Sequence, residues 1–74
     1  MNFVVTGDVY TYKNRKELQA DIEKLGGKVT GSVSSKTNYL INNDVNSNSS
    51  KNKKAKELGI PIISEQQFID MMKG

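Results

Sequence analysis

The sequence contains no cysteine and no histidine, and only one of its 74 residues is proline. Without cysteine there can be no disulfide bond or thiolate chemistry, and without either residue type the usual zinc sites are excluded. Without histidine, the side chain that most often serves as an acid–base catalyst is missing as well. The acidic residues are scattered along the chain, and no pair of them predicts a catalytic dyad. We therefore expect a domain without catalytic residues, metal ion or cofactor.

Long apolar runs are also absent. The longest have three or four residues, too few to cross a membrane, and the first residues lack the pattern of a signal peptide. Apolar residues make up 35% of the chain, which predicts a thin core. We expect one domain spanning residues 1–74, excised from a larger protein because a strand-like run begins at once. The expected location is the bacterial cytoplasm, or the nucleus in a eukaryote, and the protein is not expected to be secreted.

The pattern of apolar residues predicts alternating strands and helices. The predicted strands are 3–6, 28–30, 37–41 and 60–63. The predicted helices are one from Asn14 to Gly26, one over 50–58 and one that opens at Ser64. This order favours an α/β fold with a parallel sheet and helices on both faces. Pro61 predicts that the last strand lies at a sheet edge.

Apolar side chains predict which helix faces turn toward the sheet. In the first helix Leu18, Ile22 and Leu25 form one stripe. In the second helix Ala55 and Leu58 form a thinner one. We expect these residues to be buried.

The end of the first strand and the start of the second helix predict an anion site. Thr6 and Gly7 end the strand, where ligands of open parallel sheets gather. The first turn of the helix carries Lys51, Lys53 and Lys54, although a helix N-terminus favours negative charge there. A bound phosphate would remove that conflict. The alternative is a solvated lysine cluster beside an ordinary strand threonine and turn glycine.

Five segments occur in a characteristic order and spacing: VVTG (4–7), LGGKV (25–29), SSKTNYLI (34–41), SKNKKAKELGI (50–60) and ISEQQF (63–68). With these segments the chain resembles a BRCT domain. Within that family it is similar to the branch found in NAD-dependent DNA ligases and in the large subunit of replication factor C. The resemblance covers nearly the whole chain.

The resemblance implies a four-stranded parallel sheet in the order 2-1-3-4, with the first and third helices on one face and the second on the other. It implies phosphate binding by Thr6, Gly7 and Lys51. The replication factor C branch adds an arginine at the start of the first helix, which corresponds to Arg15. The family usually has a tryptophan in the third helix. Phe68 stands at that position here, and this replacement is the one that the ligase branch has.

The function expected from these observations is a non-catalytic, phosphate-recognising module of a DNA replication or repair protein. Its partner would be a DNA end or nick with a 5′-phosphate, with Arg15, Lys53 and Lys54 contacting the DNA backbone. The alternative is a protein-interaction module that binds a phosphopeptide or packs against another domain, and a purely structural role is a third reading. Tyr10 and Tyr12 would either stack on a base or cover the core.

Overall fold

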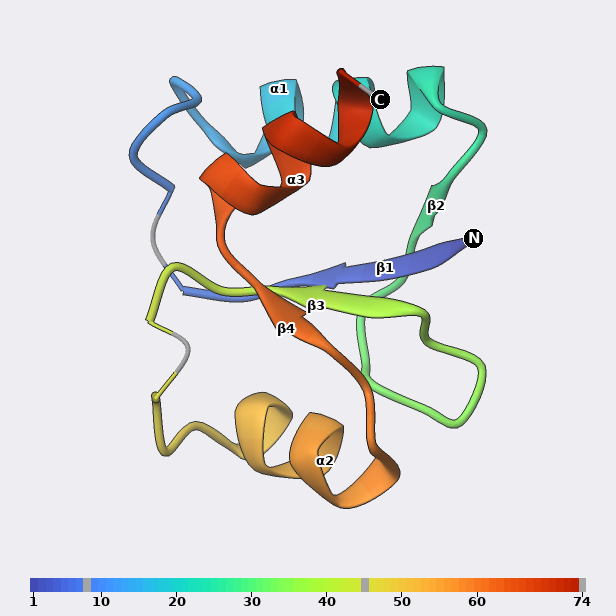
Figure 1. Cartoon of the computed structure of the whole chain (residues 1–74), viewed down its shortest axis with the longest axis vertical. Helices are drawn as coiled ribbons and strands as arrows, with labels where there is room; N and C mark the ends of the chain where they lie inside the picture. The colour runs from blue at the N-terminus through green and yellow to red at the C-terminus, as the bar shows by residue number, and fades with distance from the viewer. Residues whose placement is uncertain (8, 45, 74) are drawn as a thin grey trace.

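The computed structural model describes residues 1–7, 9–44 and 46–73. Its four parallel strands form one sheet in the order β2-β1-β3-β4. Helices α1 (Arg15–Lys24) and α3 (Glu65–Met72) cover one face of the sheet, and α2 (Ser50–Leu58) covers the other (Figure 1). The strands are β1 (Asn2–Val5), β2 (Lys28–Val29), β3 (Tyr39–Ile41) and β4 (Ile62–Ile63). The predicted BRCT-like α/β fold, with its strand order, is confirmed.

Strand β1 lies inside the sheet, between β2 and β3, and contributes side chains to both hydrophobic clusters. Phe3 pairs with Val29 on one side and with Tyr39 on the other. Because successive side chains of a strand point to opposite faces, Phe3 and Val5 join one cluster while Val4 joins the other. Strand β1 is therefore buried on both faces of the sheet.

The larger cluster lies between the sheet and helices α1 and α3. Leu18 and Ile22 of α1 and Phe68 of α3 are fully buried in it. The ring of Phe68 meets that of Phe3 edge to face at 5.7 Å between centroids, and Phe3 stacks on Tyr39 at 5.5 Å. Phe68 thus anchors α3 on the sheet through an aromatic contact that favours this edge-on geometry.

The smaller cluster lies under α2 and contains Val4, Leu40 and Ala55. The expected burial of Leu58 is wrong, because its side chain is exposed. Gly59 turns the chain with a φ of +71°, and the amide of Ile60 then donates to the carbonyl of Ala55 at 2.8 Å. This C-terminal turn brings Ile60 into the cluster in place of Leu58.

The expected burial of Leu25 is also wrong, since its side chain is exposed. Leu25 follows the last residue of α1 as its C-cap. The next turn brings the backbone of Gly27, rather than the side chain of Leu25, against Ile22 and Phe3.

Helices α1 and α3 start at their predicted capping residues, and α2 starts after Ser49, for which no capping role was predicted. Asn14 accepts a hydrogen bond from the amide of Glu17, and Ser49 accepts one from the amide of Asn52. Ser64 and Gln67 form a complete capping box at the start of α3. Strand β4 pairs only with β3 within the described sheet, so Pro61 does precede an edge strand.

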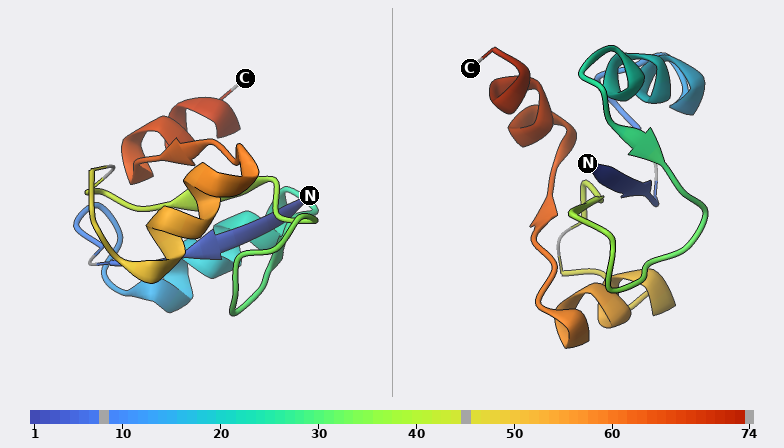
Figure 2. Two further views of the ribbon diagram at one scale, coloured as in Figure 1. Left: turned by 90° about the horizontal axis from the view of Figure 1, so that it is seen from below. Right: turned by 90° about the vertical axis from the view of Figure 1, so that its right-hand side faces the viewer.

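Figure 2 shows the same layers from two other sides, with α2 alone on its face of the sheet. The segments that follow β1 and β3 both lie beyond the carboxyl ends of these strands, on the left of Figure 1. Among the described helices, none has the length and apolar character needed to cross a membrane.

Gly27 provides a test of the packing between α1 and the sheet. A Cβ atom at this position would lie 2.9 Å from Cγ2 of Ile22 and 3.0 Å from Cε1 of Phe3. We expect Gly27→Ala to lower the free energy of unfolding by about 1–3 kcal/mol, because both neighbours are fully buried. Urea denaturation measures this loss.

Gly31→Ala is the matched control, because a Cβ atom there meets nothing within 4 Å. Its effect should stay within about 0.5 kcal/mol. Equal destabilisation by the two variants would contradict the packing described for Gly27.

Candidate anion-binding site

A hollow opens beyond the carboxyl ends of β1 and β3, with a volume of about 240 Å³. This is smaller than the usual site for a drug-sized ligand, and it suits a small polar group. Two stretches that are distant in the sequence line it, one at the end of β1 and one between β3 and α2. The lining residues of the hollow are Thr6, Gly7, Tyr10, Asn42, Asn43, Asp44, Ser47 and Ser49.

Thr6 and Gly7 form the side of the hollow that belongs to β1. The amide of Thr6 donates to the carbonyl of Ile41 at 3.0 Å, which extends the pairing of β1 and β3 by one residue. Gly7 has a φ of +78°, and a Cβ atom there would lie 2.9 Å from Oδ1 of Asn42. Backbone conformation and close approach therefore both favour glycine at this position.

Two buried asparagines connect the end of β3 to the start of α2. Asn42 is 3% exposed and Asn52 is 0% exposed. Nδ2 of Asn42 donates to Oδ1 of Asn52 at 3.0 Å, and Nδ2 of Asn52 donates to the carbonyl of Ser47 at 2.8 Å. These bonds fix the first turn of α2 against the sheet and hold the loop that joins β3 to α2.

Asn52 was not predicted, since it lies within the lysine run. One signal was available. Asn52 precedes Ala55 by three residues and therefore shares its helix face, which turns toward the sheet.

The N-terminus of α2 borders the hollow through its N-cap, Ser49. No acidic residue lies in the first turn of this helix. The end of β1 and the beginning of α2 therefore lie side by side, and the helix end is one that favours negative charge.

The three predicted lysines lie along α2 next to this helix end. Lys51 is the second residue of α2 and is partly buried, while Lys53 and Lys54 are exposed. None of the three is among the described residues that line the hollow. The structure thus brings together Thr6, Gly7 and the helix terminus, with Lys51 two residues beyond the lining residue Ser49.

Arg15 reaches the same region from the first position of α1. Its Nη2 donates to the carbonyl of Gly7 at 2.8 Å, although the residue is exposed. The guanidinium therefore lies against the rim of the hollow, with further donors left for other partners. The arginine that the family resemblance pointed to is within reach of the β1 end.

Asp44 is the negatively charged residue among those that line the hollow. It is exposed, and its amide donates to Oδ1 of Asn42 at 3.0 Å. Its charge opposes an anion, so binding would depend on the helix terminus and on nearby cations. Across residues 1–7, 9–44 and 46–73, no three acidic side chains gather into a group that could hold a metal ion.

Glu65, one of the scattered acidic residues, is a buried carboxylate, which the sequence did not predict. It is 1% exposed, and it accepts the amides of Tyr10 at 2.6 Å and of Thr11 and Tyr12 at 3.1 Å each. Asn43 also donates to it from Nδ2. Burial on its own would raise the pKa of Glu65, but the bonds from Asn43 and the three amides outweigh it and lower that pKa.

An acidic residue in the first turn of a helix is common, which explains why Glu65 gave no signal of burial. The three amides that it accepts come from a loop more than fifty positions earlier, and Asn43 lies 22 positions earlier. Spacing within the helix therefore could not identify them.

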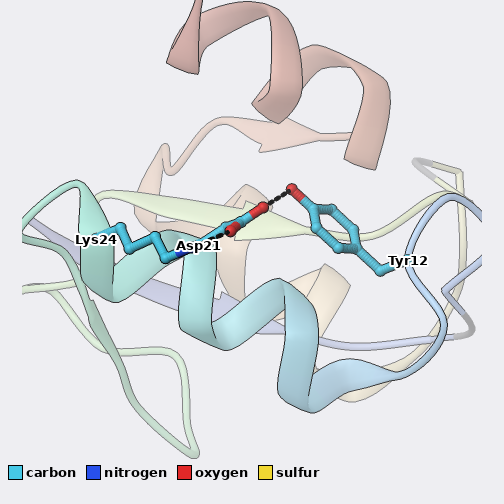
Figure 3. A network of polar contacts seen from close by, with 3 residues as sticks. All are labelled: Tyr12, Asp21 and Lys24. Carbon is cyan, nitrogen blue, oxygen red and sulfur yellow. Dashed lines mark hydrogen bonds and ion pairs between the residues drawn. The ribbon is translucent and has the colours of Figure 1, made fainter.

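The two loop tyrosines have different surroundings. Tyr12 packs against the larger cluster, and its hydroxyl donates to Oδ2 of Asp21 at 2.8 Å (Figure 3). Asp21 also lies 3.8 Å from Nζ of Lys24. Burial, the bond to Asp21 and the nearby negative charges raise the pKa of Tyr12. Tyr12 thus covers the core, whereas Tyr10 is 76% exposed at the rim of the hollow.

Comparison with known proteins finds one matching family model and several similar proteins. The model of the BRCA1 C Terminus (BRCT) domain matches residues 1–72. The chain is 67% identical over 72 residues to a DNA ligase of Ruminiclostridium cellulolyticum and 61% identical over 72 residues to a DNA ligase of Lachnoclostridium phytofermentans. Each alignment covers 97% of this chain and 11% of the relative, so the chain spans about a tenth of the length of these ligases.

The lowered pKa of Glu65 predicts a pH-dependent contribution to stability. Because the folded state holds the carboxylate more strongly than the unfolded state, the contribution is complete above the ordinary pKa of 4.5 and is lost as the pH falls through the lowered value. Near pH 7, Glu65→Gln should lower the free energy of unfolding by about 1–3 kcal/mol. Urea denaturation at several pH values measures both effects.

Glu23→Gln provides the control, since Glu23 is an exposed carboxylate on α1. The gap between wild type and Glu65→Gln should narrow in acid, and the control should stay close to wild type throughout. A gap that does not change with pH would show that the charge of Glu65 is not what stabilises the loop.

Proposed function

The chain belongs to the BRCT family, and on that basis we propose that it is a non-catalytic module that recognises a phosphate group on DNA, at a 5′-phosphorylated end or nick. One observation carries the proposal. Thr6, Gly7 and the N-terminus of α2 border one small hollow. Such a terminus offers a positive dipole end and backbone amides to an anion, although the amide of Asn52 already donates to Ser49.

Each proposed site residue has a distinct part in this account. The Thr6 hydroxyl and the Gly7 amide donate to the phosphate oxygens, and the Lys51 ammonium supplies the compensating positive charge. Arg15, already placed at the Gly7 carbonyl, contacts the neighbouring DNA backbone. Lys53 and Lys54 are exposed and add further charge for the same backbone. Contacts of this kind position a protein on DNA without reading sequence.

The similarity to bacterial DNA ligases supports a place for this module in DNA processing. We propose that it serves a larger replication or repair protein of the bacterial cytoplasm as a positioning device, with the chemistry done by other parts of that protein.

Lys51→Glu tests the proposed phosphate site. Wild type should bind a 5′-phosphorylated duplex more tightly than its dephosphorylated twin. In the variant the ratio of the two affinities should fall by about tenfold or more, as expected for the loss of a charged hydrogen bond. The fold should remain, because a negative charge in the first turn of α2 suits the helix dipole. Fluorescence anisotropy with labelled duplexes measures binding, and circular dichroism checks folding.

Lys56→Glu is the matched control, since it makes the same charge change in the last turn of the same helix. It should weaken binding to both duplexes alike and keep the preference for phosphate. Equal affinity of wild type for the two duplexes would refute the proposal.

The same titration at increasing salt separates DNA binding from packing against a protein. Neutralising two to four phosphates should give a slope of about −2 to −4 in log affinity against log salt. An affinity that does not depend on salt would instead favour the protein-interaction alternative.

A further inference from the structure

We infer that Tyr10 is a stacking platform for the base of the nucleotide whose phosphate occupies the hollow, and that Glu65 is the positioning residue that holds this platform in place. The inference rests on the proposed function. It adds a second recognised group, because the ligand is then a nucleotide with its base and not a bare phosphate.

Tyr10 is unusual among the aromatic residues of the described chain. Phe3 and Phe68 are fully buried, and Tyr12 and Tyr39 pack against the larger cluster. Tyr10 is 76% exposed and yet borders the hollow together with Thr6 and Gly7. Its ring therefore presents apolar surface to solvent beside the group of donors proposed to hold a phosphate.

The backbone beneath this ring is held firmly. Three successive amides, those of Tyr10, Thr11 and Tyr12, donate to the one buried carboxylate of Glu65. Fixing the backbone before binding reduces the conformational entropy that the ligand must offset.

The same carboxylate is connected to the hollow itself. Asn43 lines the hollow, donates to Glu65 through Nδ2, and accepts the amide of Glu65 at 3.0 Å through Oδ1. The segment after β3 and the Tyr10 loop are thus held by one pair of side chains, Asn43 and Glu65. This fixes the backbone that carries the exposed ring relative to the lining of the hollow.

A nucleobase is the chemistry that fits an exposed ring next to a phosphate site. A base is joined to its own 5′-phosphate through one sugar, and stacking on an aromatic ring accepts any base. Such a contact agrees with binding that does not read sequence. A phosphopeptide would also bring a phosphate, but it would place no base over Tyr10.

A comparison of two duplex ends tests the inference. Both ends carry a 5′-phosphate, and one has a normal terminal nucleotide while the other has an abasic one. Wild type should bind the abasic end about tenfold more weakly. Tyr10→Ala should bind the normal end about tenfold more weakly than wild type does, and it should bind the abasic end with the same affinity as wild type. Tyr10→Phe should behave like wild type with both ends.

Glu65→Gln tests the positioning role, with Glu23→Gln as its control. At a temperature where circular dichroism shows Glu65→Gln folded, it should lose much of the difference between normal and abasic ends and keep the preference for phosphate. A uniform loss of affinity for every duplex would overturn the positioning role. The Tyr10 variants decide the stacking role independently of how stable Glu65→Gln is.

The possible failures are distinguishable. If wild type binds phosphorylated and dephosphorylated duplexes equally, the proposed function fails and this inference fails with it. If the phosphate preference is present but neither base removal nor Tyr10→Ala changes affinity, only the stacking inference is overturned.

Discussion

The hydrogen bond between the buried side chains of Asn42 and Asn52 is the interaction on which the candidate site depends. It joins the end of β3 to the first turn of α2, and an unpaired buried amide would cost about 1–3 kcal/mol. The start of α2 is therefore fixed beside the end of β1. The side chain of Asn42 also leaves no room for a Cβ atom at Gly7. The shape of the hollow follows from these constraints.

Polar contacts hold the loops at the carboxyl ends of the strands, while apolar contacts hold the layers of the domain together. The hydrophobic residues form two small clusters on opposite faces of the sheet. The loops at the carboxyl ends are instead organised by buried hydrogen bonds of Asn42, Asn52 and Glu65. A chain with only 35% apolar residues can in this way keep this edge of the sheet polar and still ordered.

The fold could be predicted because its elements carry local signals. Helix α2 has the predicted bounds, since Ser49 and Gly59 mark its two ends. Strands β2, β3 and β4 are shorter than predicted, and β1 has the predicted length but lies one residue earlier, because β propensity does not report where pairing stops. Thr6 and Gly7 were predicted to meet the start of α2, and Thr6, Gly7 and Ser49 do line one hollow. Asn52 and Glu65 were missed because distant partners make their burial favourable, and periodicity treats polar residues as surface.

The central claim is that the end of β1 and the N-terminus of α2 bind one phosphate together. Nuclear magnetic resonance of ¹⁵N-labelled protein, titrated with a 5′-phosphorylated duplex and its dephosphorylated twin, tests it most directly. The account predicts that the amides of Gly7, Lys51 and Asn52 shift together with the phosphorylated duplex and much less with the other. Shifts that are the same for both duplexes, or that fall on only one of the two segments, would contradict it.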